Sequence, residues 1–386
     1  MSKAAQRTLR SLTIIVGIQW MGATMGLPLL PLFLRDRGGT PTIVGFIMAG
    51  FPVAGLLTQF TMGRLTDKFG RKPILASSLL AYALACFFFV LPVHAPWFVI
   101  ARLVQGAAAG AIEVTALSAV AVLVPEAERG RAVSRVFAAQ LLGCALGPLA
   151  GVAVSASHLG WAFACAGVAS VLAGVVAMRS TLEGGREIDR SEPLPPLQLD
   201  RRIIGALVGT ATTGLCIGVY ESCWSLLMHA HHASELQIRM SWTIFCVPWV
   251  VLSPLGGWLA DHGNRKVVAT VGACSTAFFL GFYPHIHQPG LMMSFGSLEA
   301  VITSLSMPSL NSLLTQGGQE REFGRRQGLS ATANTGSLAL TSATSGALFT
   351  LAPSLPFTIV AVTAFTLSLT LPWWWRGSNG RVRMAS

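Results

Sequence analysis

The stretch from Gly63 to Pro73, GRLTDKFGRKP, places four cations and one acid in eleven residues. The segments on either side, TQFTM before it and ILASSLLAYALACFFFVL after it, carry no charged residue. Such a charged stretch could bind nucleic acid, cradle a phosphate group, or form the turn between two buried helices. The composition of the rest of the chain separates these possibilities.

The chain is unusually poor in charge for its length. Of its 386 residues 52% are hydrophobic and only 11% are charged, whereas soluble domains carry roughly 25% charged residues. Apolar segments recur along the whole chain, and many approach the ~20 residues that a helix needs to cross a bilayer. The first of them follows MSKAAQRTLR without a small-residue cleavage site, so we interpret it as a span and not as a removable signal peptide.

Twelve apolar segments can be delimited, separated by short polar stretches. The expected spans are residues 11–34, 42–62, 74–92, 96–124, 134–155, 160–178, 203–228, 238–258, 267–284, 289–315, 327–350 and 355–375. A long polar segment with Pro and Gly interruptions, RSTLEGGREIDRSEPLPPLQLDRR, separates the sixth span from the seventh. We therefore predict an all-α membrane protein with twelve transmembrane helices in two six-helix bundles, residues 1–178 and 203–386, joined by a linker at 179–202.

The basic residues predict the orientation of these spans. Of the 27 Lys and Arg residues, 23 fall in the termini, the central linker and the loops on one side of the spans. Short loops rich in Lys and Arg stay in the cytoplasm, so both termini and the linker are expected to be cytoplasmic. This asymmetry also accounts for the net charge of +11 without a nucleic-acid partner. The expected partner is the lipid bilayer.

Two cytoplasmic segments recur at the same spacing. GGWLADHGNRKV at 257–268 repeats GRLTDKFGRKPI at 63–74, and EFGRRQG at 322–328 repeats ERGRAVS at 128–134; both pairs are 194 residues apart. Two matches at one offset indicate an internal duplication. Transporters built from duplicated halves place the substrate path between those halves, near the middle of the bilayer.

These segments resemble those of a known family. GRLTDKFGRKP resembles the signature between spans two and three of the major facilitator superfamily. Three further stretches resemble its twelve-span drug:proton antiporter branch: LPLLPLFL with Pro28 and Pro31, ARLVQGAAAG with Arg102 and Gln105, and GCALGPLAGV in span five, where Val152 replaces the final glycine of the pattern. The resemblance covers the whole chain and implies the major facilitator fold.

The resemblance also implies a function. It predicts a secondary active transporter of the bacterial cytoplasmic membrane that exports a small lipophilic or cationic molecule in exchange for protons, by alternating access. Uptake of a small metabolite, by proton symport or by facilitation, remains the alternative because the span-five pattern is incomplete. The expected partners are the small-molecule substrate and protons, and the chain is expected to be monomeric.

Span five carries a regular stripe of small residues. Gly143, Gly147 and Gly151 recur every four residues, so a neighbouring helix backbone can approach closely along one face. Pro148 removes a backbone donor and is expected to bend the helix. Close packing with a bend explains the stripe as well as the role that the resemblance implies, which is to seal the two halves against leak.

Four ionisable residues lie inside expected spans: Arg102 and Glu113 in span four, Glu221 in span seven and Glu299 in span ten. A charge at mid-bilayer costs roughly 2.5–3.5 kcal/mol or more, so each needs a partner, a cavity or a proton. In the resembled fold these spans line the central cavity. Arg102 and Glu113 lie about 16 Å apart along one helix face, so Arg102 is expected to contact Gln105, backbone carbonyls or another helix.

Glu221 is the preferred proton carrier or cation anchor. Tyr220 and Trp224 are its neighbours in GVYESCWSLLM, and an acid beside aromatic rings suits a lipophilic cation. Trp224 could instead belong to an interfacial aromatic belt. Glu299 is the second choice, and Glu113 could equally be part of a gate. A buried, hydrogen-bonded carboxyl that holds helices together is the alternative for each acid.

The opening stretch is interpreted as the cytoplasmic turn between spans two and three. Gly63 and Gly70 permit close approach and a tight turn. The resemblance implies a gate in which Asp67 and Arg71 hold the halves together while the cavity faces outward, with Arg131 a candidate partner. The second copy supplies the equivalent pair Asp261 and Arg265.

Other chemistries lack their motifs. The sequence contains no H-E-x-x-H, G-x-S-x-G or G-x-x-x-x-G-K-[ST], so we expect neither an enzyme nor an ATP-driven pump, and no cofactor. An intramembrane enzyme and a non-transporting sensor remain minor alternatives. Five histidines in two expected external loops could bind a metal, but polar loop tips explain them as well, and no metal site is predicted: His229, His231, His232, His285 and His287.

Overall fold

A computed structural model describes residues 3–124, 126–179, 199–316 and 320–376. In this part of the chain the regular elements are all helical. The first group comprises α1 (Lys3–Met25), η1 (Leu27–Leu29), α2 (Leu30–Asp36), α3 (Pro41–Phe69), α4 (Arg71–Phe88), η2 (Ala95–Trp97), α5 (Phe98–Leu123), α6 (Glu126–Ala150), η3 (Ala156–His158) and α7 (Leu159–Arg179). The second comprises α8 (Arg201–Ala230), α9 (Glu235–His262), α10 (Arg265–Phe282), η4 (Tyr283–His285), α11 (Pro289–Thr315), α12 (Glu320–Leu351) and α13 (Leu355–Trp374).

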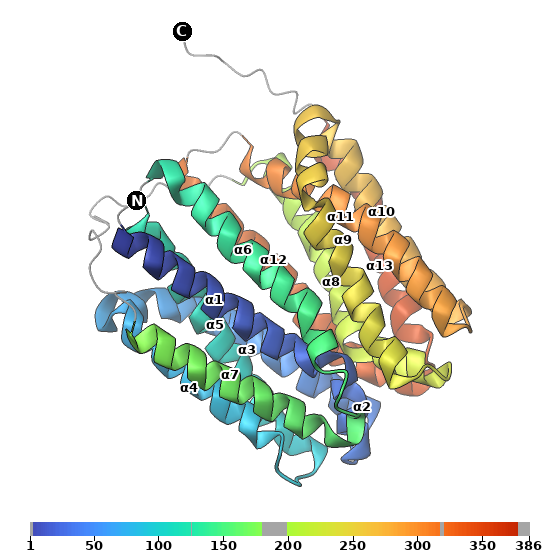
Figure 1. Cartoon of the computed structure of the whole chain (residues 1–386). Coiled ribbons are helices and arrows are strands. Elements are labelled where there is room, and N and C mark those ends of the chain that lie inside the picture. Colours follow the sequence, from blue (N-terminus) through green and yellow to red (C-terminus); the bar gives the residue numbers. More distant parts are fainter. Residues whose placement is uncertain (1–2, 125, 180–198, 317–319, 377–386) are drawn as a thin grey trace.

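Each group packs mainly within itself. In the first, α1 packs on α6, α3 on α5 and α4 on α7; in the second, α8 packs on α12, α9 on α11 and α10 on α13. Two helix pairs, α3 with α12 and α6 with α9, provide most of the contact between the groups, which lie side by side in Figure 1. We call them the first half and the second half. Most of the predicted linker at 179–202 lies outside the described residues.

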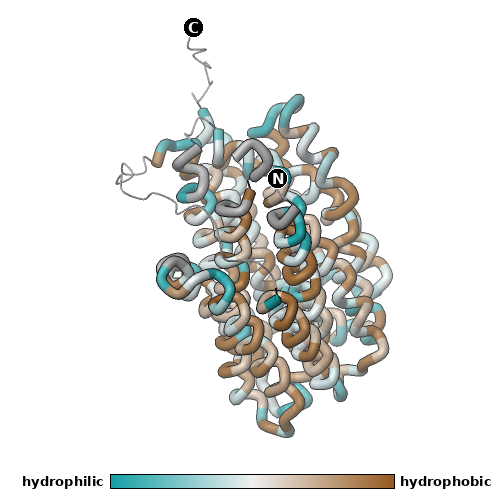
Figure 2. Tube along the Cα trace, turned by 60° about the vertical axis from the view of Figure 1, so that its left-hand side comes forward, coloured by the Kyte–Doolittle hydropathy of each residue, from teal (hydrophilic) through white to brown (hydrophobic). Residues whose placement is uncertain are grey.

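The composition of the helices is that of a membrane-spanning bundle. In the described part of the chain eleven helices are long and apolar enough to cross a membrane. Figure 2 shows hydrophobic residues along the length of the bundle and hydrophilic residues concentrated toward its ends. We call the end at which α1 begins and α13 ends the terminal end, and the opposite end the distal end.

The predicted span at 11–34 is not one continuous helix. It divides at Gly26 into α1, η1 and α2, and Pro28 and Pro31 lie in the first turns of the two new segments. Proline fits there because the first residues of a helix need no backbone donor. Gly26 also makes room for Phe163, because a Cβ at this position would lie 2.8 Å from its ring, which would have to move.

The helix at the predicted span 327–350, α12, does not have the apolar composition of the others. It contains the polar run ATANTGSLALTSATSG and is not among the eleven apolar helices. Some of its polar groups bond to α8 inside the bundle: Ser342 Oγ donates to Gly218 O at 3.2 Å, and Asn334 Nδ2 donates to Thr210 O at 3.2 Å. Since α12 packs between α3 and α8, much of its surface meets other helices of the protein.

The duplication predicted from the sequence is also visible in how the helices begin. Thr40 caps α3 by accepting a hydrogen bond from Ile43 N at 3.3 Å. Ser234, 194 residues later, caps α9 by accepting from Gln237 N at 3.2 Å. Side chains of this type satisfy backbone donors that the first turn leaves free.

Candidate functional site

A buried carboxylate lies at the centre of the second half. Glu299 on α11 is 1% exposed, and two phenols donate hydrogen bonds to it. Tyr220 Oη on α8 lies 2.9 and 3.0 Å from its two carboxylate oxygens, and Tyr283 Oη on η4 lies 2.7 Å from Oε2. Two donors on one carboxyl suit its ionised form, which only accepts hydrogen bonds. The site therefore holds a desolvated carboxylate between two aromatic rings.

Aromatic side chains extend this site into a pocket. Trp224 makes edge contacts with Tyr283, at a ring-centroid distance of 4.8 Å, and with Tyr220, at 5.9 Å; its Nε1 donates to Ser241 at 2.9 Å. The pocket is lined by Ile217, Tyr220, Trp224, Ser241, Trp242, Phe245, Tyr283, Met292, Met293, Gly296 and Glu299. Trp242 Nε1 is buried and has no hydrogen-bond partner among the described residues. An acid within an aromatic wall suits a lipophilic cation.

These contacts change the preference expressed above for Glu221. Tyr220 donates to Glu299, and the ring contacts of Trp224 lead to Tyr220 and Tyr283. The interfacial-belt alternative for Trp224 is wrong, because this residue is 7% exposed and hydrogen-bonded inside the bundle. Glu221 is half-buried on α8 and interacts electrostatically with Arg102 of the first half.

Arg102 is a buried cation on α5. It is 4% exposed, its Nη1 donates to Gln105 Oε1 at 3.4 Å, and its guanidinium lies 4.6 Å from the ring centroid of Phe51. The expected contact with Gln105 is thus present. Gln105 is fully buried and donates in turn to Cys86 Sγ at 3.2 Å. The described residues include no carboxylate within ion-pair distance of Arg102, so the guanidinium is held by an amide and an aromatic face.

Glu113 lies further along α5. Its Oε2 accepts a hydrogen bond from Gln59 Nε2 on α3 at 3.3 Å. The carboxyl therefore faces the contact between α3 and α5 and does not pair with Arg102.

The predicted gate lies at the terminal end. Gly70 joins α3 to α4 with φ +87°, a conformation that favours glycine, and Arg71 Nε donates to Ser118 Oγ of the same half at 3.2 Å. Arg131 is exposed on α6. Gly63 and Asp67 belong to α3, and the surroundings of Gly63 and the side chain of Asp67 lie outside what the structure describes. A gating role for this stretch remains a prediction.

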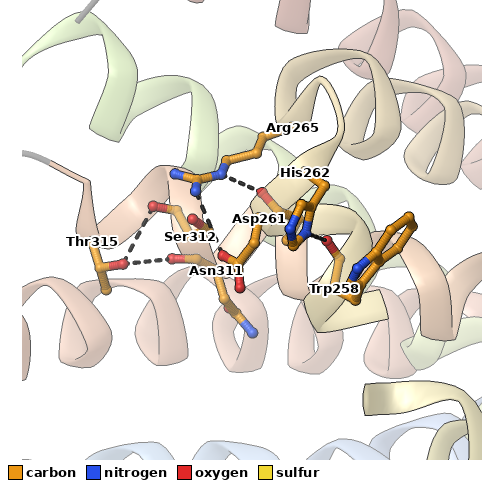
Figure 3. A network of polar contacts seen from close by, with 8 residues as sticks. Trp258, Asp261, His262, Arg265, Asn311, Ser312 and Thr315 are labelled. Carbon is orange, nitrogen blue, oxygen red and sulfur yellow. Dashed lines mark hydrogen bonds and ion pairs between the residues drawn. The ribbon is translucent and has the colours of Figure 1, made fainter. Parts of the chain in front are cut away.

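In the second copy of the charged stretch, at residues 257–268, the side chains of Asp261 and Arg265 face each other. Arg265 Nη2 lies 3.6 Å from Asp261 Oδ1, and Arg265 Nε donates to Ala260 O (Figure 3). Beside them His262 stacks on Trp258 with ring centroids 4.9 Å apart. All these contacts lie within the second half, at the turn from α9 to α10.

The glycine stripe of α6 faces α1 of the same half. A Cβ at Gly143 would meet Gly17 O, and one at Gly147 would meet Thr24 Oγ1 and, at 2.5 Å, Met21 O. The predicted close helix approach is confirmed, with Pro148 inside α6. All three glycines therefore serve packing inside the first half, because a Cβ at Gly151 would also lie 2.5 Å from Met25 O.

Gly151, at the end of the stripe, makes room for a residue of the second half. A Cβ here would lie 2.5 Å from Arg239 Nη1. Arg239 on α9 is 1% exposed, and it donates to Met25 O at 2.9 Å and to Val154 O at 2.5 Å. One turn earlier, Glu235 Oε2 accepts a hydrogen bond from Ala156 N at 2.9 Å. We call Glu235 and Arg239 the distal latch, because they fasten α9 to the first half at the distal end.

The sequence did not reveal this latch. Its partners are backbone atoms, which leave no pattern in the sequence. The internal duplication gives one indication of this contact, because Glu235 and Arg239 lie 194 residues after Pro41 and Gly45. In that corresponding contact Gly45 packs against α12, where a Cβ would lie 2.7 Å from Ser342 O, and a Cβ at Gly346 would meet Pro41 O. At one side of the distal end the two halves are thus joined by glycine packing. At the other side they are joined by the hydrogen bonds of Glu235 and Arg239 to backbone atoms of the first half.

The distal histidines form a small aromatic contact. The rings of His231 and His287 are 5.1 Å apart, edge to face. Burial, followed by the neighbouring His287 and His232 imidazoles, lowers the pKa of His231. Across the described ranges no three potential metal ligands come together.

Comparison with known proteins places this geometry in a family. The model of the Major Facilitator Superfamily matches residues 12–220 and again residues 206–384. The chain belongs to this superfamily. It is therefore a multi-pass integral membrane protein and a transporter, with the all-α fold of that family. The two successive matches agree with the duplication at a spacing of 194 residues.

Two curated relatives are drug-resistance proteins. Multidrug resistance protein 2 of Bacillus subtilis (strain 168) is 27% identical over 161 residues, which are 42% of this chain and 40% of the relative. Quinolone resistance protein NorA of Staphylococcus aureus (strain MSSA476) is 24% identical over 216 residues, 54% of this chain and 55% of the relative. The chain thus matches about half the length of these relatives.

Solved structures show the same fold over nearly the whole chain. A D-xylose-proton symporter superposes with a TM-score of 0.75 at 17% identity, covering 94% of this chain and 96% of the symporter. A bacterial homologue of the human lysosomal transporter Spinster, in an inward-facing and occupied conformation, superposes with a TM-score of 0.73 at 13% identity, covering 97% of each chain. At these identities the likeness concerns the fold alone.

Proposed function

We propose that this superfamily member is a proton-coupled antiporter that exports a small lipophilic or cationic molecule across the bacterial cytoplasmic membrane. The observation that carries the proposal is the Glu299 carboxylate, buried between the Tyr220 and Tyr283 hydroxyl groups at the wall of an aromatic pocket. The multidrug and quinolone resistance functions named for the two relatives support it.

In this proposal Glu299 binds a proton and the cargo in turn. An ionised carboxylate attracts a cation, and the surrounding rings add cation–π contacts and apolar surface. A protonated carboxyl has lost that attraction, so a proton that binds to Glu299 releases the cargo. Glu221 and Arg102 interact across the two halves, and we assign them to the coupling of this exchange to the movement of the halves.

Alternating access then needs one end to close while the other opens. With the terminal end assigned to the cytoplasm by its Lys and Arg residues, the distal latch and the Gly45–Gly346 contact close the outer side. The pocket in this arrangement would load from the cytoplasm. The gate at 63–73 would close the inner side in the opposite state, with Asp67, Arg71 and Arg131 as its candidate residues.

The experiment that tests the proposal is proton release on binding. Tetraphenylphosphonium, a lipophilic cation without hydrogen-bonding groups, is added to detergent-solubilised protein in weak buffer with a pH indicator. Where part of the protein carries a protonated Glu299, the bound cation favours the ionised carboxylate and displaces that proton, so we expect proton release by the native protein near neutral pH. The Glu299→Gln variant, which cannot ionise at this position, should release none and should bind the cation at least tenfold more weakly.

A matched control variant shows whether the effect is specific to Glu299. Tyr82→Phe removes a buried phenol of the first half, outside the pocket, and should bind and release protons like the native protein. Unchanged binding and proton release in Glu299→Gln would remove Glu299 from the mechanism. Proton uptake by the native protein on binding would favour symport, the alternative function, over antiport.

A further inference from the structure

Four cations gather at the terminal end of the second half, apart from Glu299 and its aromatic pocket. Arg201 and Arg202 begin α8, Lys266 lies in the first turn of α10, and Arg376 follows the end of α13. The helices α8 and α10 both pack on α13. Among the described residues no carboxylate lies within ion-pair distance of any of these four cations.

The end of α13 lies between three of these cations. Lys266 Nζ donates to Trp375 O at 2.8 Å, and Trp375 Nε1 donates to Arg202 O at 3.4 Å. The Trp375 side chain is 1% exposed, so it fixes the end of α13 inside the second half. On the outside, the Arg201 guanidinium lies 5.0 Å from the ring centroid of Trp373. The cations are therefore held in place around the last turn of α13.

The positive charge of this cluster is not balanced by the described side chains. Arg202 Nε is buried and has no hydrogen-bond partner among the described residues. Asp200 is the acid next to the cluster in the chain, and it caps α8 by accepting a hydrogen bond from Ile203 N at 2.8 Å. An oxyanion would supply the missing acceptors, and a guanidinium matches the geometry of phosphate oxygens.

Apolar side chains lead from the cluster along the outside of two helices. They recur at helical spacing on one face of each helix and are exposed: Val362, Phe365, Leu369 and Trp373 on α13, and Val267, Val271, Phe278 and Phe282 on α10. These helices pack on each other and lie side by side in Figure 1. In a membrane-spanning bundle such faces meet acyl chains, and tryptophan marks the level of the headgroups.

We propose that the terminal ends of α8, α10 and α13 form a binding site for one anionic phospholipid. Its phosphate oxygens accept hydrogen bonds from Arg202 and Lys266, and its acyl chains lie along the apolar faces of α10 and α13. Lys266 has three donors, so it also keeps its bond to Trp375 O. Basic pockets between membrane-spanning helices are suited to such headgroups. This lipid site is independent of the direction of transport and of the charge on Glu299.

The experiment compares two phospholipids with identical acyl chains. Phosphatidylglycerol, which is anionic, and phosphatidylcholine, which is zwitterionic, are added separately to the detergent-solubilised full chain, and bound lipid is counted by native mass spectrometry. The native protein should bind one phosphatidylglycerol about tenfold or more tightly than phosphatidylcholine. Arg202→Gln and, separately, Lys266→Gln should weaken phosphatidylglycerol binding about fivefold and leave phosphatidylcholine binding unchanged.

A matched control separates this site from a general effect of charge. Arg10 is an exposed cation at the terminal end of the first half, and Arg10→Gln should bind phosphatidylglycerol like the native protein. A further variant covers the case in which Arg202→Gln or Lys266→Gln does not fold. Arg201 is exposed, and its recorded side-chain contact is the Trp373 ring, so Arg201→Gln should fold and still weaken phosphatidylglycerol binding.

Four results would overturn the lipid site. The first is equal affinity of the native protein for the two phospholipids. The second is undiminished phosphatidylglycerol binding in the folded variants of Arg201, Arg202 and Lys266. The third is equal weakening in Arg10→Gln, which would reveal attraction by overall charge. The fourth is displacement of phosphatidylglycerol by glycerol phosphate, which has the anionic group without acyl chains and would identify a site for soluble phosphate esters.

Discussion

A contact between a glycine and a threonine is repeated in the two halves with the residues exchanged. In the first half Gly147 of α6 packs on Thr24 of α1, and in the second half Gly218 of α8 packs on Thr341 of α12. Thr24 and Gly218 are 194 residues apart, and so are Gly147 and Thr341. Both arrangements let two helix backbones approach at the same depth, because only one partner carries a side chain.

This exchange predicts a rescue. The variant Gly147→Thr should destabilise the protein, by about 1–3 kcal/mol or more, because two threonines cannot occupy the contact. The double variant Thr24→Gly with Gly147→Thr reproduces the arrangement of the second half and should recover most of the lost stability. Thermal unfolding in detergent measures both.

The prediction has a clear contrary result. If the double variant is as unstable as the sum of its single variants, the two positions are energetically independent and the repeated contact has no structural meaning.

For single residues, the sequence predicts which acids lie inside the membrane-spanning helices, but it does not predict their hydrogen-bond partners. The four ionisable residues inside spans follow from the apolar segments that surround them. That Tyr220 donates to Glu299, 79 residues away, depends on the rotation of two helices about their axes. Neither helix has a strongly polar face that would reveal this rotation. Sequence neighbours alone therefore favour Glu221, whereas in the structure the two tyrosine hydroxyl groups donate to Glu299.

Among the elements, α9 carries the distal latch, which in the proposed mechanism holds the distal end closed. Its Arg239 makes hydrogen bonds to two carbonyls of the first half, and Glu235 accepts one from a backbone N–H. Hydrogen bonds to charged groups contribute about 1.5–3 kcal/mol each. A change of 1.4 kcal/mol alters an equilibrium tenfold, so the latch can dominate the balance between two conformations.

The double variant Glu235→Ala with Arg239→Ala should therefore shift the protein toward a state open at the distal end, by tenfold or more. Spin labels at the exposed positions His94 and Gly290, one in each half at that end, report the separation by pulsed electron resonance. We expect a longer distance to become the major population, with Glu235→Gln, which keeps an acceptor oxygen, changing little. An unaltered distance distribution in the double variant would show that glycine packing alone closes this end.

Most elements could be predicted because apolar length and composition decide them. The break at Gly26 and the burial of the polar residues of α12 could be predicted only in part from the sequence. Pro28 and Pro31 carry part of the family resemblance, but that resemblance does not indicate that new helical segments begin at them. The hydroxyl groups of α12 need partners on α8, such as Thr210 and Gly218, which a single helix sequence does not show.

For the whole molecule, the duplication explains why two similar halves carry different chemistry. Position 105 in the first half is Gln, and position 299, 194 residues later, is Glu. At the distal end the first half contributes Pro41 and Gly45 where the second contributes Glu235 and Arg239. The two halves thus share their helix packing but differ in where they place charged residues. In the proposed mechanism the second half carries both the proton-binding acid, Glu299, and the distal latch.

The measurement that tests the account most directly is ethidium transport in proteoliposomes under an imposed pH gradient. Vesicles enclosing DNA report the entry of ethidium by fluorescence. With the interior more acidic than the medium, outward proton flow should drive ethidium inward through the native protein, and neither Glu299→Gln vesicles nor vesicles treated with a protonophore should respond. Ethidium entry that is fastest with an acidic medium, or that is the same in Glu299→Gln, would contradict proton antiport at Glu299.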